Sequence, residues 1–128
     1  MTGVLAVPYA ASAGMNPDVV FIGVRGSGQA GPGTPGWTPA KTDPLGLGPE
    51  LASAYGRVLQ AVEKRRNVAA VSIAYPASHV TKLVQNRAQY FRGIDEGVRK
   101  LNAELSRQAK QHPRARFVLA GYSQGAMV

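Results

Sequence analysis

This 128-residue chain contains no cysteine, few acidic residues and no long apolar run. Without cysteine it can form neither a disulfide nor a thiolate metal site, and its redox compartment cannot be inferred. Its apolar runs fall far short of the roughly 20 residues that a transmembrane helix needs. Hydrophobic residues nevertheless make up 45% of the sequence, as in ordinary folded domains. We therefore expect a globular domain that is soluble or peripheral to a membrane.

The shortage of acids leaves a strongly basic chain, with 15 Lys and Arg residues against 7 Asp and Glu and a formal charge of +8. Such a balance can indicate a protein that binds nucleic acid or an anionic surface. The basic residues are spread over helical patterns, however, and aromatic residues do not alternate with them as in a base-stacking platform. Solvated helix faces explain the charge better, so we expect no nucleic-acid partner. The oligomeric state stays open.

Histidine is also scarce, because only His79 and His112 are present. Neither has a second histidine or a carboxylate beside it at metal-ligand spacing, so we expect no metal and no other cofactor. His79 follows the second predicted strand and is the one candidate for a rearranged catalytic base. His112 precedes the third predicted strand and is better explained as a surface-turn residue.

The first 15 residues have a composition of their own. Met1 to Ala13 are small and apolar and end in Ala10-Ala11-Ser12-Ala13, which resembles an export-signal cleavage site, but no positively charged leading region precedes them. Residues 1–15 therefore fit either a signal-peptide remnant or a flexible N-terminus. Residues 16–128 form the predicted domain.

Strand and helix patterns alternate along this domain. Apolar runs at 18–24, 68–75 and 116–120 predict buried strands. Helical spacing predicts helices over 49–62 and over about 83–110. Connections of this length between successive strands imply right-handed crossovers and a parallel sheet, so the predicted fold class is α/β.

The apolar spacing also predicts which helix faces are buried. In the first helix the predicted stripe includes Leu51, Tyr55, Val58 and Leu59. In the second helix it comprises Tyr90, Ile94, Val98, Leu101 and Leu105. Between the first strand and the first helix, residues 25–48 are rich in glycine and proline, and a loop of this length in a compact domain is usually functional.

The most informative segment is Gly121-Tyr122-Ser123-Gln124-Gly125, which directly follows the third predicted strand. This G-x-S-x-G pattern is typical of a nucleophile elbow, in which small residues allow a sharp turn that lifts the serine hydroxyl above the sheet. The pentapeptide alone is a weak signal. The context supports it, because a strand precedes the segment, small residues follow it and strands alternate with helices around it. A glycine-rich turn whose serine has no catalytic role is therefore the poorer explanation.

Three blocks of sequence resemble the cutinase family of α/β-hydrolases, from about Pro17 to the last residue. The first is Phe21 to Gly28, which is similar to the family's strand and A-R-G-S or A-R-G-T loop, with Val24 where alanine is usual. The second is Leu47 to Ala52, together with Tyr75-Pro76-Ala77. The third is Gly121 to Ala126, which is identical to the family's usual G-Y-S-Q-G-A. The resemblance implies the N-terminal part of a three-layer sandwich with a parallel sheet.

The resemblance also implies roles for three residues in the hydrolysis of carboxylic esters. Ser123 is the expected nucleophile, which would form an acyl-enzyme. Gln124 is expected to donate its backbone N–H to the oxyanion, and Ser27 its backbone N–H and hydroxyl. Arg25 is better explained as a loop anchor than as a ligand for an acidic group. Lipids, polyesters and acetylated polysaccharides all remain candidate substrates, and the family resemblance suggests a secreted enzyme.

The sequence departs from the family pattern at two points. The positions of a disulfide that the family usually carries hold Asn16 and His112. In addition, the family's Asp and His follow the serine along the chain, so we expect both to lie beyond residue 128. We therefore expect the complete protein to be an esterase and residues 1–128 alone to be inactive. The alternative is a non-catalytic truncated hydrolase or binding protein that associates through an unpaired sheet edge.

Overall fold

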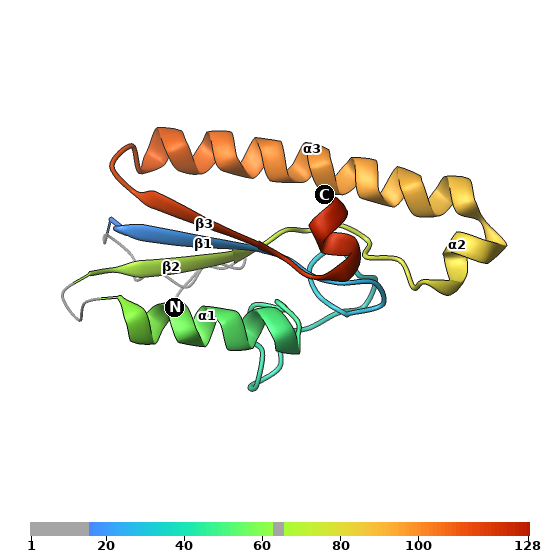
Figure 1. Ribbon diagram of the computed structural model, residues 1–128, viewed down its shortest axis with the longest axis horizontal. Coiled ribbons are helices and arrows are strands. Elements are labelled where there is room, and N and C mark those ends of the chain that lie inside the picture. The colour runs from blue at the N-terminus through green and yellow to red at the C-terminus, as the bar shows by residue number, and fades with distance from the viewer. Residues whose placement is uncertain (1–15, 63–65) are drawn as a thin grey trace.

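The computed structural model describes residues 16–62 and 66–128, so the expectation for residues 1–15 lies outside the described residues. Within these described residues, three strands, three α-helices and a short 3₁₀-helix follow one another (Figure 1). They are β1 (Val19–Val24), α1 (Pro49–Ala61), β2 (Val68–Ser72), α2 (Thr81–Gln85), α3 (Arg87–Gln111), β3 (Arg116–Gly121) and η1 (Ser123–Met127). The alternation of strands and helices confirms the predicted α/β class.

The three strands form a parallel sheet in the order β2-β1-β3. Val19 at the start of β1 pairs with Val68 of β2 on one side and with Arg116 of β3 on the other. At the far end of β1, Val24 pairs with Gly121. All three strands therefore end at the same edge of the sheet, and the loops that follow β1 and β3 leave it as neighbours.

The helices cover the sheet from both sides (Figure 1). On the α3 face the buried core includes Val20, Ile22 and Val71, with Leu101 of α3 packed against it. On the α1 face the core includes Phe21 and Ala70, together with residues of α1 such as Leu51. Alternate residues of β1 thus point into two different cores, as the buried apolar run predicted. The structure confirms the three-layer arrangement.

One predicted core residue of α1 is not buried. Leu51 is 5% exposed and Tyr55 packs with its ring 5.3 Å from that of Phe21, but Leu59 is 47% exposed. The prediction for Leu59 is wrong because a helix buries only one stripe against a sheet, and Val58 occupies the inner side at this level.

The long helix predicted over residues 83–110 is interrupted. Asn86 has a φ of −152° and separates α2 from α3. Its side-chain oxygen accepts a hydrogen bond from the backbone N–H of Gln89 at 3.1 Å, so Asn86 caps the start of α3. Short polar side chains favour this position over a helix interior, which explains the break. The stripe of α3 is otherwise confirmed at Tyr90 and Ile94, which are 5% and 6% exposed.

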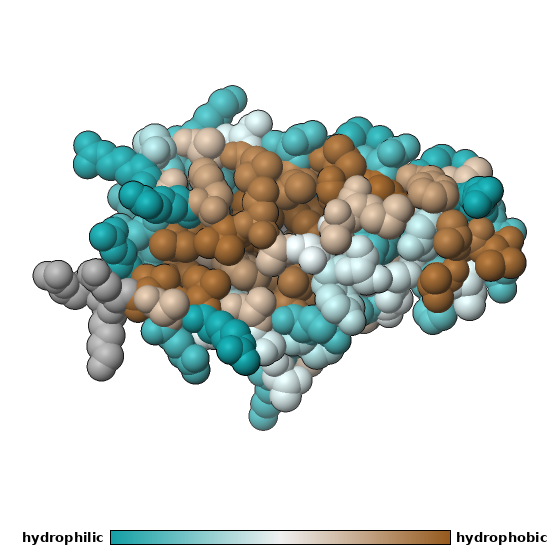
Figure 2. All heavy atoms as spheres, viewed as in Figure 1, coloured by the Kyte–Doolittle hydropathy of each residue, from teal (hydrophilic) through white to brown (hydrophobic). Residues whose placement is uncertain are grey.

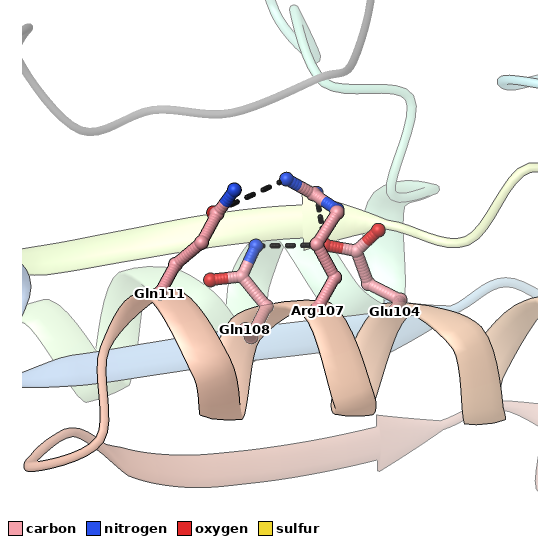
Figure 3. Close-up of polar contacts among 4 residues, drawn as sticks. All are labelled: Glu104, Arg107, Gln108 and Gln111. Carbon is pink, nitrogen blue, oxygen red and sulfur yellow. Dashed lines mark hydrogen bonds and ion pairs between the residues drawn. The ribbon is translucent and has the colours of Figure 1, made fainter.

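The C-terminal part of α3 carries a cluster of polar contacts (Figure 3). Gln108 is fully buried and donates from Nε2 to the carboxylate of Glu104 at 2.7 Å. The same carboxylate forms an ion pair with Arg107, which also contacts Gln111. All four residues belong to the last two turns of α3, so these contacts stabilise the helix end locally.

β3 lies at the edge of the described sheet. Leu119 in the middle of this strand is 56% exposed, and Tyr122 and Met127 just beyond it are 43% and 54% exposed. Apolar side chains gather on the molecular face that this strand presents (Figure 2). An unpaired edge with an apolar face is a surface on which other chains or segments can pack.

Candidate active site

The serine of the G-x-S-x-G segment stands at the tip of a sharp turn. β3 ends at Gly121, and η1 begins two residues later at Ser123. Ser123 has a φ of +55°, a left-handed conformation that costs a non-glycine residue about 1–3 kcal/mol. The side chain is exposed rather than packed. A strained, exposed serine between a strand and a helix is what the predicted nucleophile elbow requires, and we call residues 121–125 the elbow.

The two glycines of the segment are required by close backbone packing. A side chain on Gly125 would place its Cβ 1.9 Å from the carbonyl oxygen of Val24. A side chain on Gly121 would place its Cβ 2.7 Å from the carbonyl oxygen of Gly125. The backbone N–H of Tyr122 also donates to the Val24 carbonyl at 3.1 Å. The elbow is therefore seated directly on the end of β1.

The loop that follows β1 touches the elbow. A Cβ on Gly26 would lie 2.7 Å from the Tyr122 ring and 3.3 Å from the Cβ of Ser123. This close approach is possible only because position 26 has no side chain. The structure therefore brings the Ser27 segment and Ser123 together, although 96 positions separate them in the sequence.

The hydrogen bonds of this loop bear on its proposed role as an oxyanion hole. The N–H of Gly26 donates to the Gln29 side chain at 2.8 Å, and the N–H of Gly28 donates to the Ala77 carbonyl at 2.8 Å. Within residues 16–62 and 66–128, no acceptor is found for the backbone N–H of Ser27. A preorganised donor of this kind can stabilise a developing oxyanion.

The hydroxyl of Ser27 points elsewhere in this structure. It donates to the backbone carbonyl of Ser78 at 2.5 Å. The loop after β2 thus braces the loop after β1, and Ala77 in that brace has a strained φ of +49°. To assist an oxyanion, the hydroxyl must rotate away from Ser78. Sequence reasoning did not find this contact, because residues 51 positions apart carry no local signal for it.

Gln124, the second predicted oxyanion donor, is the second residue of η1, where the first backbone N–H groups have no acceptor within the helix. Its side chain is 2% exposed, and Oε1 lies 3.4 Å from the Tyr75 hydroxyl. That hydroxyl donates its one proton to the Arg25 carbonyl, which is closer at 2.6 Å. Tyr75 therefore lies between the start of the Ser27 loop and the residue that follows Ser123.

Tyr75 was missed as a site residue, although a signal was available. A tyrosine at the end of a buried strand needs a hydrogen-bond partner for its hydroxyl. Tyr75 is fully buried, and burial raises the pKa of its hydroxyl to about 12 despite the nearby charge of Arg25. The hydroxyl is therefore protonated at neutral pH and acts as a hydrogen-bond donor.

Arg25 is a fully buried loop anchor, as the sequence predicted. Its guanidinium donates to the backbone carbonyls of Gln29, Ile73 and Tyr75 and to the hydroxyl of Thr34. The guanidinium carbon also lies 5.3 Å from the centre of the Tyr75 ring. Burial lowers the pKa of Arg25, against the opposing effect of Tyr75. These contacts fix the path of the chain on either side of Ser27.

The two histidines take up different places. His79 packs against Gly28, with ring atom Cδ2 2.9 Å from the position of a Cβ on that glycine. Its Nδ1 accepts the backbone N–H of Thr81 at 3.2 Å. His112 follows α3 and precedes β3, at the end of that strand opposite Ser123. The hydrogen bonds found for His79 within residues 16–62 and 66–128 go to Thr81, and His112 lies at the far end of β3 from Ser123, so neither histidine is held against Ser123 as a base.

Asn16 and His112, which occupy the family's disulfide positions, line one cleft together with Pro17 and Pro113. The two positions therefore lie along the same cleft, at the end of the sheet where β3 begins. Within the described parts of the chain, no group of three His, Cys, Asp or Glu residues could hold a metal. The described helices also include none that is both long and apolar enough to span a bilayer.

Comparison with known families agrees with this geometry. The family model described as Cutinase matches residues 38–128, which include α1, the whole of β3 and the serine elbow. This chain belongs to the cutinase family. No curated protein matches it. Cutinases are a family of carboxylic-ester hydrolases with the α/β-hydrolase fold, and the three-stranded parallel sheet corresponds to part of that fold.

Proposed function

We propose that the natural protein is a secreted serine esterase that hydrolyses carboxylic esters with Ser123 as its nucleophile. The observation that supports the proposal is the close approach of Gly26, the residue before Ser27, to the Cβ of Ser123. A nucleophile and an oxyanion donor must converge on one carbonyl group for acyl transfer. The family match supports the same reaction class.

In the proposed mechanism the Ser123 hydroxyl attacks the ester carbonyl and forms an acyl-enzyme, and water then releases the acid. The backbone N–H groups of Ser27 and Gln124 hold the oxyanion, and the Ser27 hydroxyl turns from Ser78 to join them. A base must still take the proton from Ser123. In the cutinase family the acid and the base follow the serine along the chain, so we expect both from positions beyond residue 128, and no turnover by residues 1–128 alone.

The assignment of Ser123 can be tested by substitution in the natural protein. Ser123→Ala should abolish hydrolysis of a p-nitrophenyl acyl ester and labelling by a serine-directed fluorophosphonate. Ser106→Ala is a matched control, because Ser106 is an exposed serine on α3, and it should retain both properties. Turnover by Ser123→Ala at the natural rate would overturn the proposal.

The oxyanion role of Ser27 predicts a different pattern. Ser27→Ala keeps the backbone N–H but removes the hydroxyl, and it should lower kcat on the order of 10²-fold with little change in KM. Labelling of Ser123 should slow but persist. If Ser27→Ala retained full kcat, the hydroxyl would serve only to hold the loop against Ser78.

A further inference from the structure

The end of the molecule formed by Val80, α2 and the first two turns of α3 exposes large apolar side chains. Val84 is 89% exposed, Val80 is 54% exposed and Phe91 is 40% exposed. Val80 is the residue before α2 and has helical backbone angles, so it lies on the same side as Val84, four residues later. Figure 2 shows apolar side chains at the end of the molecule where Figure 1 places α2. We call this end the α2 tip.

The α2 tip is also cationic. Lys82, Arg87 and Arg92 are exposed within or beside it. No acidic residue occurs in the sequence between Glu63 and Asp95, so no carboxylate of this segment offsets these charges. Apolar side chains next to exposed Lys and Arg form the pattern by which proteins bind at the interface of an anionic membrane.

The charge does not continue evenly along α3. A cleft of about 470 Å³ next to the tip is lined by Arg92 and Arg99 but also by Asp95 and Glu96. The two acids offset the two arginines, so the net positive charge next to apolar side chains is concentrated at Lys82 and Arg87. This limits the proposed contact to the tip itself.

The tip is joined to the candidate active site by a short connection. Residues 76–80 run from the end of β2 to α2, and within them Ala77 and Ser78 accept hydrogen bonds from the Ser27 loop. His79 packs against Gly28 in that loop. A surface that holds the tip therefore lies close to the loop beside Ser123.

We propose that the α2 tip docks on the surface of a bilayer that contains anionic phospholipid. Val80, Val84 and Phe91 enter the headgroup region, while Lys82 and Arg87 contact lipid phosphates. This binding does not depend on catalysis, so it is measured with Ser123→Ala in the natural protein. Its outcome is thus separate from that of the esterase proposal.

The test is co-sedimentation with vesicles of phosphatidylcholine, alone or mixed with phosphatidylglycerol. Binding is expected to the mixed vesicles and to weaken as salt is added. Changing Lys82 and Arg87 together to Gln should weaken it about 25-fold, from about fivefold for each cation near an anionic surface. Val84→Asp should weaken it on the order of tenfold, because one apolar side chain no longer enters the interface.

Matched controls come from α1, on the opposite face of the sheet. Leu59→Asp and Arg57→Gln change one exposed apolar and one exposed basic side chain there, and both should leave vesicle binding unchanged. Equal losses in the control variants, equal binding to phosphatidylcholine alone, or no binding to mixed vesicles would each overturn the proposal. Equally tight binding to duplex DNA would also overturn it, because charge alone would then explain the contact.

Discussion

The packing of the elbow against the end of β1 can be tested by adding a single methyl group at Gly125. Its Cβ would lie 1.9 Å from the Val24 carbonyl oxygen and 2.6 Å from the carbonyl carbon. Carbon and oxygen atoms normally approach to about 3.3 Å, so the backbone must open by more than about 1 Å. Both partners are main chain, and no rotamer change can relieve the overlap. Gly125→Ala should therefore cost about 3 kcal/mol or more.

Substitutions at two further glycines show whether a loss of stability in Gly125→Ala comes from steric collision or from backbone strain. A Cβ added to Gly56 on α1 would have no atom within 4 Å, and this residue has no positive φ, so Gly56→Ala should stabilise the fold by about 0.5–1 kcal/mol. Gly36 has equally open space but a φ of +76°, so Gly36→Ala should cost about 1 kcal/mol from backbone strain alone. Collision with neighbouring atoms is expected only in Gly125→Ala.

The measurement is urea unfolding of the natural protein and the three variants, followed by circular dichroism. Equal m-values would show that the free energies of unfolding can be compared directly. In thermal unfolding, the loss for Gly125→Ala corresponds to a Tm lower by about 10 °C or more. A Gly125→Ala variant as stable as Gly56→Ala would show that the elbow does not rest on the β1 backbone, and the proposed site geometry would fail with it.

Three other substitutions give distinct outcomes. Tyr75→Phe removes the hydroxyl that donates to the Arg25 carbonyl and should lower kcat more than it raises KM; it should also delete a phenol that ionises only near pH 12 in an ultraviolet titration. Asn86→Ala removes the cap of α3 and should cost about 1 kcal/mol in urea unfolding, with kcat unchanged. His112→Gln tests the stability of the fold in acid. Burial, and then the charge of Arg107, lowers the pKa of His112 in the folded protein. As the pH falls below about 6.5, the unfolded state therefore binds more protons than the folded state, and the free energy of unfolding declines. The variant should lose less stability between pH 7 and pH 5 than the natural protein, and equal losses would contradict this reasoning.

Much of the fold could be predicted from the sequence because its main signals are local. The apolar residues of β1, and those of the strand before Gly121, are enough to predict each strand. The long connections between the strands then require them to be parallel. The break at Asn86 was not predicted, since the helical apolar spacing continues from Leu83 across it. Leu59 was assigned to the core because an apolar stripe read from spacing alone is wider than the face that a sheet covers.

In the candidate site, too, local features could be predicted and long-range contacts could not. The sharp turn at Ser123 could be predicted, because such a turn demands small neighbours within five residues. The contact between Ser27 and Ser78 and the link from Tyr75 to Arg25 could not be predicted, because each joins residues about 50 positions apart. Their partners are backbone carbonyls, which any residue type supplies, so no side-chain pattern marks them.

The strand order accounts for the convergence of Ser27 and Ser123. β1 and β3 are adjacent, and their last paired residues are Val24 and Gly121. Neighbouring strands lie about 4.8 Å apart, so the residues that follow this pair leave the sheet side by side. An intervening strand would separate the two loops by about 10 Å, too far for donors on one loop to reach a carbonyl at the other. A one-residue slip of β3 would move Ser123 by about 3.3 Å and turn its neighbours to the opposite face. Such a slip would also break the close contact that Gly125 makes with the Val24 carbonyl in the observed register.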